Sequence, residues 1–287
     1  MAPAGPVKPS LAQSGLQVLR EWGFEAVCAG NIDRSQRYLA GDDHERLDGV
    51  LDLLNQDVDA LLALRGGYGT ARILPHLPWE TLARWGGWVV GFSDVTALHC
   101  ALASHGFPVA TLHGPMVSQL GRDWRTAARL LAWLTGKGKE TLFRFTSAHV
   151  VRHGLARGEA VGGNLSVLSS LVGTPFEPPW QDTVVFLEEV GEPLYRLDRL
   201  LTQLRLASRL ARVNAVVVGT LAGCGRGEQG WKQGWRELLA DAAPRAVIVE
   251  GLAFGHGMRN RAFPLGVEVE VDTGRGTVRW SPGSVGS

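Results

Sequence analysis

The sequence predicts an α/β protein that combines an N-terminal open parallel sheet with a C-terminal β-rich α/β domain. In the first half, short apolar runs alternate with segments of helical periodicity, which indicates a parallel sheet with helices on both faces. After Gly136-Lys-Gly-Lys139 the pattern shifts toward strands and loops, which indicates a domain boundary. The 287 residues are enough for two such domains, and we expect them at 1–138 and 139–287.

Each expected element has its own periodicity, and glycine or proline marks many of the ends. The first half is expected to be flavodoxin-like or Rossmann-like. Its expected helices lie at 11–23, 95–104 and 124–134, with one more from the acidic turn at 42–45 to about 55 and another that begins at 70. Its expected strands lie at 24–28, 58–64, 88–90 and 109–112. In the second half we expect strands at 141–145, from 150, and at 158–164, 184–187, 213–221, 246–250, 267–271 and 277–280, with helices at 165–171, 195–206 and 231–242. The stretch 3–9 reads as a loop that a strand would normally precede, and that strand is expected to be missing or a stub.

Composition narrows the class of protein. The net charge of +1 favours neither nucleic acid nor an anionic membrane as a partner. No apolar run approaches the roughly 20 residues that span a bilayer, and the N-terminus lacks the apolar core of a signal peptide. Cys28, Cys100 and Cys224 are widely spaced and are expected to be reduced core residues. We therefore expect a cytoplasmic protein without a metal site.

Ser93 lies where a short apolar run, 88–90, gives way to a helix. A serine in such a turn is pushed out of the packed layers and lies over the positive end of the helix. The alternative is a simple helix cap, because Ser and Asp both accept bonds from the first free N–H groups. An earlier strand leads into Arg65-Gly-Gly-Tyr-Gly69, whose spacing matches neither the P-loop nor the dinucleotide fingerprint but offers free backbone N–H groups.

Ser93, Glu188 and His256 each come directly after a buried apolar run or in the loop that follows it. Catalytic groups collect at strand ends in α/β architectures, and the order serine, acid, histidine is the one that α/β-hydrolases use. Serine needs an imidazole to take its proton, and the imidazole needs a carboxylate to fix its tautomer. Taken singly, His256 could be structural and Glu188 could pair with a nearby arginine of the helix at 195–206.

Seven motifs occur in one order along the chain: Arg65-Gly-Gly-Tyr-Gly69, Gly91-Phe-Ser-Asp94, His113-Gly-Pro-Met116, Gly162-Gly-Asn-Leu165, Leu187-Glu-Glu189, Arg196-Leu-Asp-Arg199 and Gly255-His256. This set resembles the LD-carboxypeptidases, serine peptidases also called muramoyltetrapeptide carboxypeptidases. The resemblance covers nearly the whole chain, to about residue 272. That family usually opens with a full strand before the 2–6 loop, so a truncated strand or a late start codon is expected here.

The resemblance implies a catalytic triad of Ser93, Glu188 and His256. It implies that the backbone N–H groups of Asp94 and of the Gly66-Gly67 pair, with Gly67 favoured, stabilise the oxyanion. The implied reaction removes terminal D-alanine from a murein tetrapeptide, in a cytoplasmic homodimer that recycles cell wall and needs neither metal nor cofactor.

Three alternatives stay open on the sequence alone. Arg65 could bind the terminal carboxylate of the substrate beside Gly66, or it could be a structural arginine bonded to loop carbonyls. The family also includes peptide amidases that act on nucleotide-linked peptide antibiotics. A non-catalytic protein that binds an anionic ligand at the 65–69 loop is the remaining class.

Overall fold

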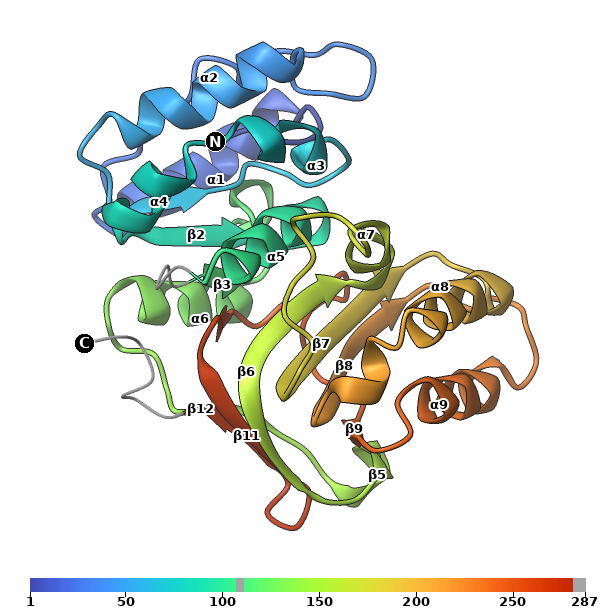
Figure 1. The fold of residues 1–287 in the computed structure, drawn as a ribbon. Coiled ribbons are helices and arrows are strands. Elements are labelled where there is room, and N and C mark those ends of the chain that lie inside the picture. The colour runs from blue at the N-terminus through green and yellow to red at the C-terminus, as the bar shows by residue number, and fades with distance from the viewer. Residues whose placement is uncertain (107–110, 281–287) are drawn as a thin grey trace.

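The N-terminal sheet of the computed structural model has four strands in the order β1-β2-β3-β10 (Figure 1). The structure describes residues 1–106 and 111–280. β1 (Ala60–Leu62), β2 (Trp88–Gly91) and β3 (Thr111–His113) run parallel, as the alternation of apolar runs and helices predicts. β10 (Phe263–Leu265) comes from the far end of the chain and pairs antiparallel with β3. The sheet is therefore mainly parallel, and the second half of the chain completes it.

Helices cover both faces of this sheet. The elements are α1 (Pro9–Glu21), α2 (Asp43–Leu54), α3 (Thr70–Ile73), α4 (Trp79–Trp85), α5 (Thr96–Ser104) and α6 (Trp124–Leu134), with short 3-10 turns at Leu74–His76, Ser93–Val95 and Val117–Gln119. Side chains of α1 and α6 share one buried cluster with Val90 and Leu112. Side chains of α2, α4 and α5 share the other with Leu61 and Val89. Alternation of side chains along each strand assigns one face to each set of helices.

The second sheet has eight strands in the order β4-β12-β11-β6-β7-β8-β9-β5. They are β4 (Thr141–Arg144), β5 (Val150–Arg152), β6 (Leu155–Asn164), β7 (Thr183–Val190), β8 (Ala215–Ala222), β9 (Val247–Val249), β11 (Glu268–Asp272) and β12 (Thr277–Trp280). The central strands β6 to β9 are parallel, and the outer pairings are antiparallel. The helices α7 (Leu165–Ser170), α8 (Leu194–Leu206) and α9 (Trp231–Ala242) lie on one face of the sheet (Figure 1). A further 3-10 turn, Ser147–His149, precedes β5, and another, Leu210–Arg212, precedes β8.

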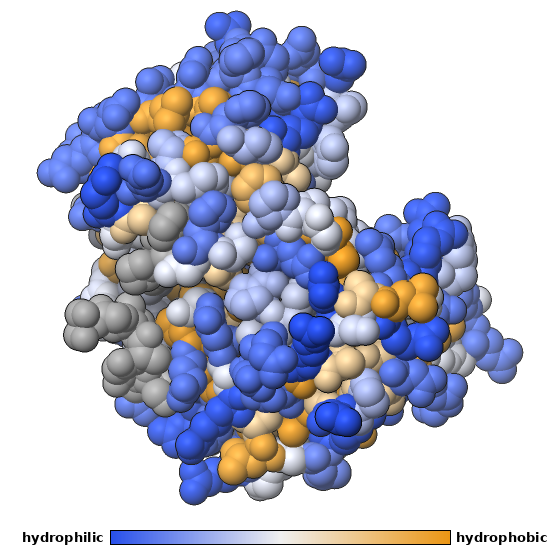
Figure 2. Space-filling view, viewed as in Figure 1, coloured by the Kyte–Doolittle hydropathy of each residue, from blue (hydrophilic) through white to orange (hydrophobic). Residues whose placement is uncertain are grey.

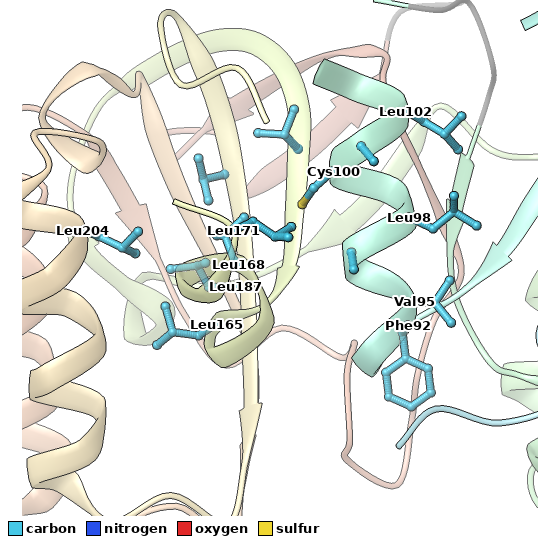
Figure 3. Close-up of a cluster of buried hydrophobic side chains, with 14 of the residues drawn as sticks. Phe92, Val95, Leu98, Cys100, Leu102, Leu165, Leu168, Leu171, Leu187 and Leu204 are labelled. Atoms are coloured by element: carbon cyan, nitrogen blue, oxygen red, sulfur yellow. The ribbon is translucent and has the colours of Figure 1, made fainter. Parts of the chain in front are cut away.

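Helix α5 joins the two halves. In Figure 3 Leu98 and Leu102 point to one side of this helix, and Cys100 points to the other side, toward Leu168 and Leu171. All five side chains belong to one buried cluster that reaches from the N-terminal sheet to α8 and α9. Because Ser93 lies just before α5, the packing of this helix against both halves holds the serine at their junction.

Several sequence predictions need correction. Residues 24–28 form no strand, although their composition predicted one. The strand predicted at 109–112 is described only from Thr111, because 109 and 110 lie outside the described residues. Helix α4 was not predicted as a separate element. Residues 1–8 form no strand, and Met1 lies beside β1, where its nitrogen donates to the Leu62 carbonyl oxygen and its carbonyl oxygen accepts the Leu64 N–H.

The acidic turn before α2, predicted as the start of a helix, caps this helix. Asp42 Oδ1 accepts a bond from the Glu45 N–H (2.9 Å), and Glu45 Oε2 accepts one from the Asp42 N–H (3.0 Å). Asp43 binds Arg72 and Arg46 instead of completing a carboxylate cluster. The carboxylates of this turn are thus used in capping and in ion pairs.

The face shown in Figure 2 is hydrophilic over most of its area, with apolar surface in small separate patches. Among the described residues, no helix is both long enough and apolar enough to span a bilayer.

Candidate active site

Ser93 lies in a strained turn at the carboxyl end of β2. Its φ is +61°, in the left-handed region that residues other than glycine rarely adopt. Gly91 makes the turn possible, because a Cβ there would lie 2.8 Å from the Val95 side chain. The side chain of Ser93 is half-buried, whereas Phe92 and Asp94 on either side are buried. Strand, turn and helix thus present one hydroxyl at the end of the sheet.

His256 lies between Ser93 and Glu188. Its Nε2 is 3.1 Å from Ser93 Oγ, and its Nδ1 is 2.7 Å from Glu188 Oε2. The backbone N–H of His256 donates to the same carboxylate oxygen (3.2 Å). Glu188 is completely buried, while the imidazole is 21% exposed. A carboxylate at Nδ1 favours the tautomer that carries a proton there, which leaves Nε2 free to accept the proton of the serine.

Asn164 holds the Glu188 carboxylate from the other side. Its Nδ2 donates to Glu188 Oε1 (3.2 Å) and to Glu189 Oε1 (2.9 Å). The backbone N–H of Asn164 donates to Thr96 Oγ1 (2.9 Å), at the start of α5 and three residues after Ser93. One residue at the end of β6 therefore connects the acid to the element that carries the serine. Thr96 comes from α5, so these bonds also cross between the two halves of the chain.

Two adjacent glutamates lie near the carboxyl end of β7, and they point to different neighbours. The register between β7 and β8 shifts between Leu187 and Glu189, and successive side chains of a strand face opposite sides. Glu188 faces His256, whereas Glu189 accepts bonds from the N–H (2.8 Å) and Oγ (2.6 Å) of Ser166 in α7. Only one of the two carboxylates is therefore within reach of the imidazole.

The glycine loop after β1 lies against Ser93. A Cβ at Gly66 would be 3.0 Å from both Cβ and Oγ of Ser93 and 3.6 Å from the backbone nitrogen of Asp94. Gly67 follows with a φ of +121°, which favours glycine. The side chain of Asp94 links the serine turn to the glycine loop, because its Oδ2 accepts a hydrogen bond from the N–H of Thr70, just after the loop (2.8 Å). Gly66 and the backbone of Asp94 thus lie beside the hydroxyl, whereas a Cβ at Gly67 would face Gly5.

Arg65 is exposed and is held by the neighbouring loop. Its Nη1 donates to the Pro6 carbonyl oxygen (2.6 Å), which is the structural contact that its alternative interpretation predicts. The contact uses one of its five N–H donors.

Two further histidines lie behind the site and are held neutral by burial. Burial lowers the pKa of His99 to about 4, although the ring Nε2 lies 3.0 Å from the Gly91 carbonyl oxygen. Burial also lowers the pKa of His113 well below its usual range. The His113 ring lies among Phe92, Phe254 and Phe263, and Phe92 in turn packs on His256 with ring centroids 4.8 Å apart. Phe92, itself packed on the neutral His113, thus forms an apolar backing to the imidazole of His256.

Within residues 1–106 and 111–280, no group of three or more His, Cys, Asp or Glu side chains is arranged to hold a metal ion. Cys100 and Cys224 are buried as predicted, but Cys28 is exposed, which contradicts the expectation of a core residue.

The structure brings the predicted residues Ser93, Glu188 and His256 together, with Gly66 and Asp94 beside them. The sequence interpretation did not assign roles to Asn164 and Glu189, although both stood in motifs that it singled out. Asn164 could have been found in the same way as Glu188, because Asn164 is a polar residue at the end of a buried strand.

The chain is similar to known proteins along most of its length. Residues 1–114 match the model of the LD-carboxypeptidase N-terminal domain, and residues 157–271 match that of the LD-carboxypeptidase C-terminal domain. The murein tetrapeptide carboxypeptidase of Pseudomonas aeruginosa is 30% identical over 98% of this chain and 94% of its own length. The microcin C7 self-immunity protein MccF of Escherichia coli is 22% identical over 94% of this chain and 88% of its own length.

Solved structures agree on the fold. The muramoyltetrapeptide carboxypeptidase of Oxalobacter formigenes superposes with a TM-score of 0.85 at 28% identity, over 98% of this chain and 96% of that one. MccF in complex with glutamyl sulfamoyl guanosine gives a TM-score of 0.87 at 18% identity, over 100% and 96% of the two chains. The predicted fold class, a mainly parallel N-terminal α/β sheet followed by a mixed β-rich sheet with helices, is therefore confirmed. With both of its domain models matched in order and a relative 30% identical along almost its full length, the chain belongs to the LD-carboxypeptidase family.

Proposed function

We propose that the protein is a serine carboxypeptidase that releases terminal D-alanine from murein tetrapeptides by hydrolysing the LD-peptide bond. The observation that carries the proposal is the imidazole of His256, which lies within hydrogen-bonding distance of both Ser93 Oγ and Glu188 Oε2. Relatives that act on murein peptides, such as the Pseudomonas aeruginosa enzyme, support the substrate class.

In the proposed reaction, Ser93 Oγ attacks the carbonyl carbon of the residue before D-alanine while His256 Nε2 takes the hydroxyl proton. Glu188 keeps Nδ1 protonated and stabilises the imidazolium that forms. When the C–N bond breaks, His256 returns the proton to the amine of D-alanine. Water then attacks the acyl-serine, again with His256 as base, which releases the shortened peptide and restores the hydroxyl.

The negative charge on the tetrahedral intermediate needs donors that are already in place. The backbone N–H groups of Asp94 and Gly67 are the proposed donors, since the loop at Gly66 lies against Ser93. Removing one such donor typically costs about 10²–10³-fold in kcat. Arg65 is proposed to pair with the terminal carboxylate of the substrate. Its bond to Pro6 uses only one N–H group, so the other guanidinium N–H groups remain for this pairing.

Mass spectrometry of products from defined tetrapeptides and pentapeptides tests the proposal. We expect D-alanine and tripeptide from the tetrapeptide with an LD bond, and no release from the same peptide ending in L-alanine. Ser93→Ala should lower kcat by about 10⁴-fold or more while the circular dichroism spectrum and Tm stay close to those of the original protein. Turnover by Ser93→Ala at the original kcat/KM would refute the assignment of the nucleophile.

Two other outcomes would replace the proposal. Faster cleavage of an aminoacyl sulfamoyl nucleoside than of the tetrapeptide would favour the amidase activity of antibiotic self-immunity. A protein that binds anionic peptides, turns none over and is not labelled by a fluorophosphonate would be a binding protein.

We further propose, as parts of the same function, that the enzyme acts in the cytoplasm and forms a homodimer.

A further inference from the structure

Positive charge is concentrated in two segments that are far apart in the sequence. Residues 121–134 and 255–262 contain five arginines and one acidic residue, Asp123, in a chain whose net charge is +1. The rest of the chain therefore carries a net negative charge. The five arginines, here called the arginine cluster, are Arg122, Arg125, Arg129, Arg259 and Arg261.

The two segments lie side by side in the fold. The Asn260 N–H donates to Thr126 Oγ1 in the first turn of α6 (3.3 Å), and the carbonyl oxygen two residues further on accepts a bond from Trp133 Nε1 (3.1 Å). Thr126 and Trp133 are seven residues apart on one face of α6, and Arg129 lies on that face between them. Burial lowers the pKa of Arg129, and the charge of Arg261 lowers it further. The arginines of the two segments are therefore close enough to repel one another.

The arginine cluster has no acidic partner in the part of the chain that the structure describes. None of its members forms an ion pair there, whereas arginines elsewhere, such as Arg157 and Arg236, pair with glutamates. The Asp123 carboxylate is used as the cap of α6, where it accepts bonds from the N–H groups of Arg125 and Thr126 and from Thr126 Oγ1. The fold thus leaves most of this positive charge without a counterion.

Members of the cluster differ in exposure. Arg122, Arg125 and Arg259 are exposed, and the guanidinium of Arg125 lies over the Trp124 ring, 5.1 Å from its centroid. Arg129 is half-buried, and its Nη2 donates to two backbone carbonyl oxygens of β4 (3.2 and 2.9 Å). Its buried Nε has no hydrogen-bond partner among the described residues. The exposed members can therefore reach a ligand, and Arg129 adds positive charge behind them.

A single residue connects the cluster to the loop that carries His256. Asn260 Oδ1 accepts the Gly255 N–H (2.9 Å), and its own N–H donates to the first turn of α6. Between these anchors Met258 is 97% exposed, and Arg259 is exposed beside it. The loop thus presents a cation three residues after an imidazole that is itself 21% exposed.

Carboxylates are suitable partners for such a cluster, because guanidinium groups bind them through paired, charge-assisted hydrogen bonds. We propose that the arginine cluster binds carboxylates of an acidic peptide substrate, other than the terminal carboxylate, and so selects acidic peptides over neutral ones. The same charge would speed the encounter of such a peptide with the site. This inference rests on the proposed function, since it names the chemistry of the peptide that the neighbouring site would cleave.

Two tetrapeptides with the same LD bond test the cluster, one with glutamate at its second position and one with glutamine there. Arg125→Gln combined with Arg259→Gln removes two exposed charges and leaves Ser93, Glu188 and His256 unchanged. For the glutamate peptide we expect KM to rise at least about fivefold, with kcat within about twofold. For the glutamine peptide both constants should stay as in the original protein.

Arg84→Gln combined with Arg245→Gln is the matched control. Both arginines are exposed and lie shortly before the amino ends of β2 and β9, at the sheet edges opposite to Ser93 and Glu188. This variant loses the same charge and should keep the original KM for both peptides. An equal rise of KM in the control, an equal rise for both peptides, or no rise at all would overturn the proposal.

Binding to Ser93→Ala separates this inference from the proposed function. Titration calorimetry in that background gives the Kd of each peptide without turnover, and the combined arginine substitutions should raise the Kd of the glutamate peptide alone, by at least about fivefold. A protein that releases no D-alanine would refute the proposed function, and the two Kd values would still decide on the cluster. A Kd for the glutamate peptide that does not change would overturn the inference even in an active enzyme.

Discussion

At the scale of single residues, the two neighbouring glutamates of β7 offer the sharpest test of the site. In Glu188→Gln, Asn164 Nδ2 keeps the amide oxygen at the Oε1 position, so the new NH2 group faces His256 Nδ1. Two donors then oppose each other, and the imidazole must move its proton to Nε2, where it can no longer accept the proton of Ser93. We expect kcat to fall by about 10³–10⁴-fold with little change in KM.

Glu189→Gln is the control, because Glu189 is equally buried but bonds to Asn164 and Ser166 rather than to His256. It should lower the free energy of unfolding by about 1–3 kcal/mol and keep most of the turnover. Steady-state kinetics and urea unfolding of both variants check this pair. Equal losses of kcat would mean that the two carboxylates act as one unit.

At the scale of elements, the loop after β9 holds the imidazole against Glu188. Gly255 has a φ of +94°, and a Cβ there would lie 2.5 Å from Glu188 Oε2. In Gly255→Ala we therefore expect a displaced carboxylate as well as backbone strain, with kcat lower by about 10²-fold or more.

Gly251→Ala provides the matched comparison in the same loop. Its φ of +75° is also left-handed, but its nearest neighbour would be His149 Cδ2 at 3.4 Å, an ordinary contact. Both variants should lose about 1 kcal/mol or more of stability from strain, and only Gly255→Ala should lose turnover. Comparable kcat values for the two variants would contradict the proposed part of this loop in positioning Glu188.

The same elements show how far the sequence could predict the site. Ser93, Glu188 and His256 were predictable as candidates because each is a polar residue near the end of a buried strand. Ser93 follows a strand of the first sheet and the other two lie at strands of the second, so only the family resemblance indicated that the three meet. The two hydrogen bonds that Asn164 donates to Glu188 and Glu189 could not be predicted, because they depend on the register of β6 beside β7. Residues 24–28 have the composition of a strand, but a strand needs a paired neighbour, and a pocket lies between them and β1. The place of β10 depends on a pairing with β3 over about 150 residues of sequence, which local patterns do not reveal.

At the scale of the whole molecule, the proposed active site is divided between the two halves of the chain. We retain the division at 138/139 as a proposal, and β10 shows that the halves are structurally interdependent. Residues 1–138 alone lack Glu188, His256 and the edge strand of their sheet, so we expect no D-alanine release from that fragment. Mixing it with 139–287 should restore activity only if the two pieces associate. Hydrolysis by 1–138 alone would place the catalytic base elsewhere.

The buried amino terminus predicts a pH dependence of the stability of the whole fold. The pKa of this amine is about 6 in the folded protein and 8.0 in the reference state, so the unfolded chain binds more protons between these values. The free energy of unfolding should therefore rise from pH 6 to pH 8, by roughly 2–3 kcal/mol at most, and this contribution is lost as the pH falls.

His99 and His113 shift in the same direction from 6.5, so they add to the slope until their unfolded forms lose their protons, about one pH unit above 6.5. Urea unfolding between about pH 7 and pH 8 is therefore dominated by the amine. Acetylation of the Met1 nitrogen removes the titrating group and should flatten the dependence in this range. A slope that persists after acetylation would assign it to another group, whereas a flat profile before acetylation would mean that water reaches the amine. Water at the amine would mean that burial of the α-amino charge costs the fold little.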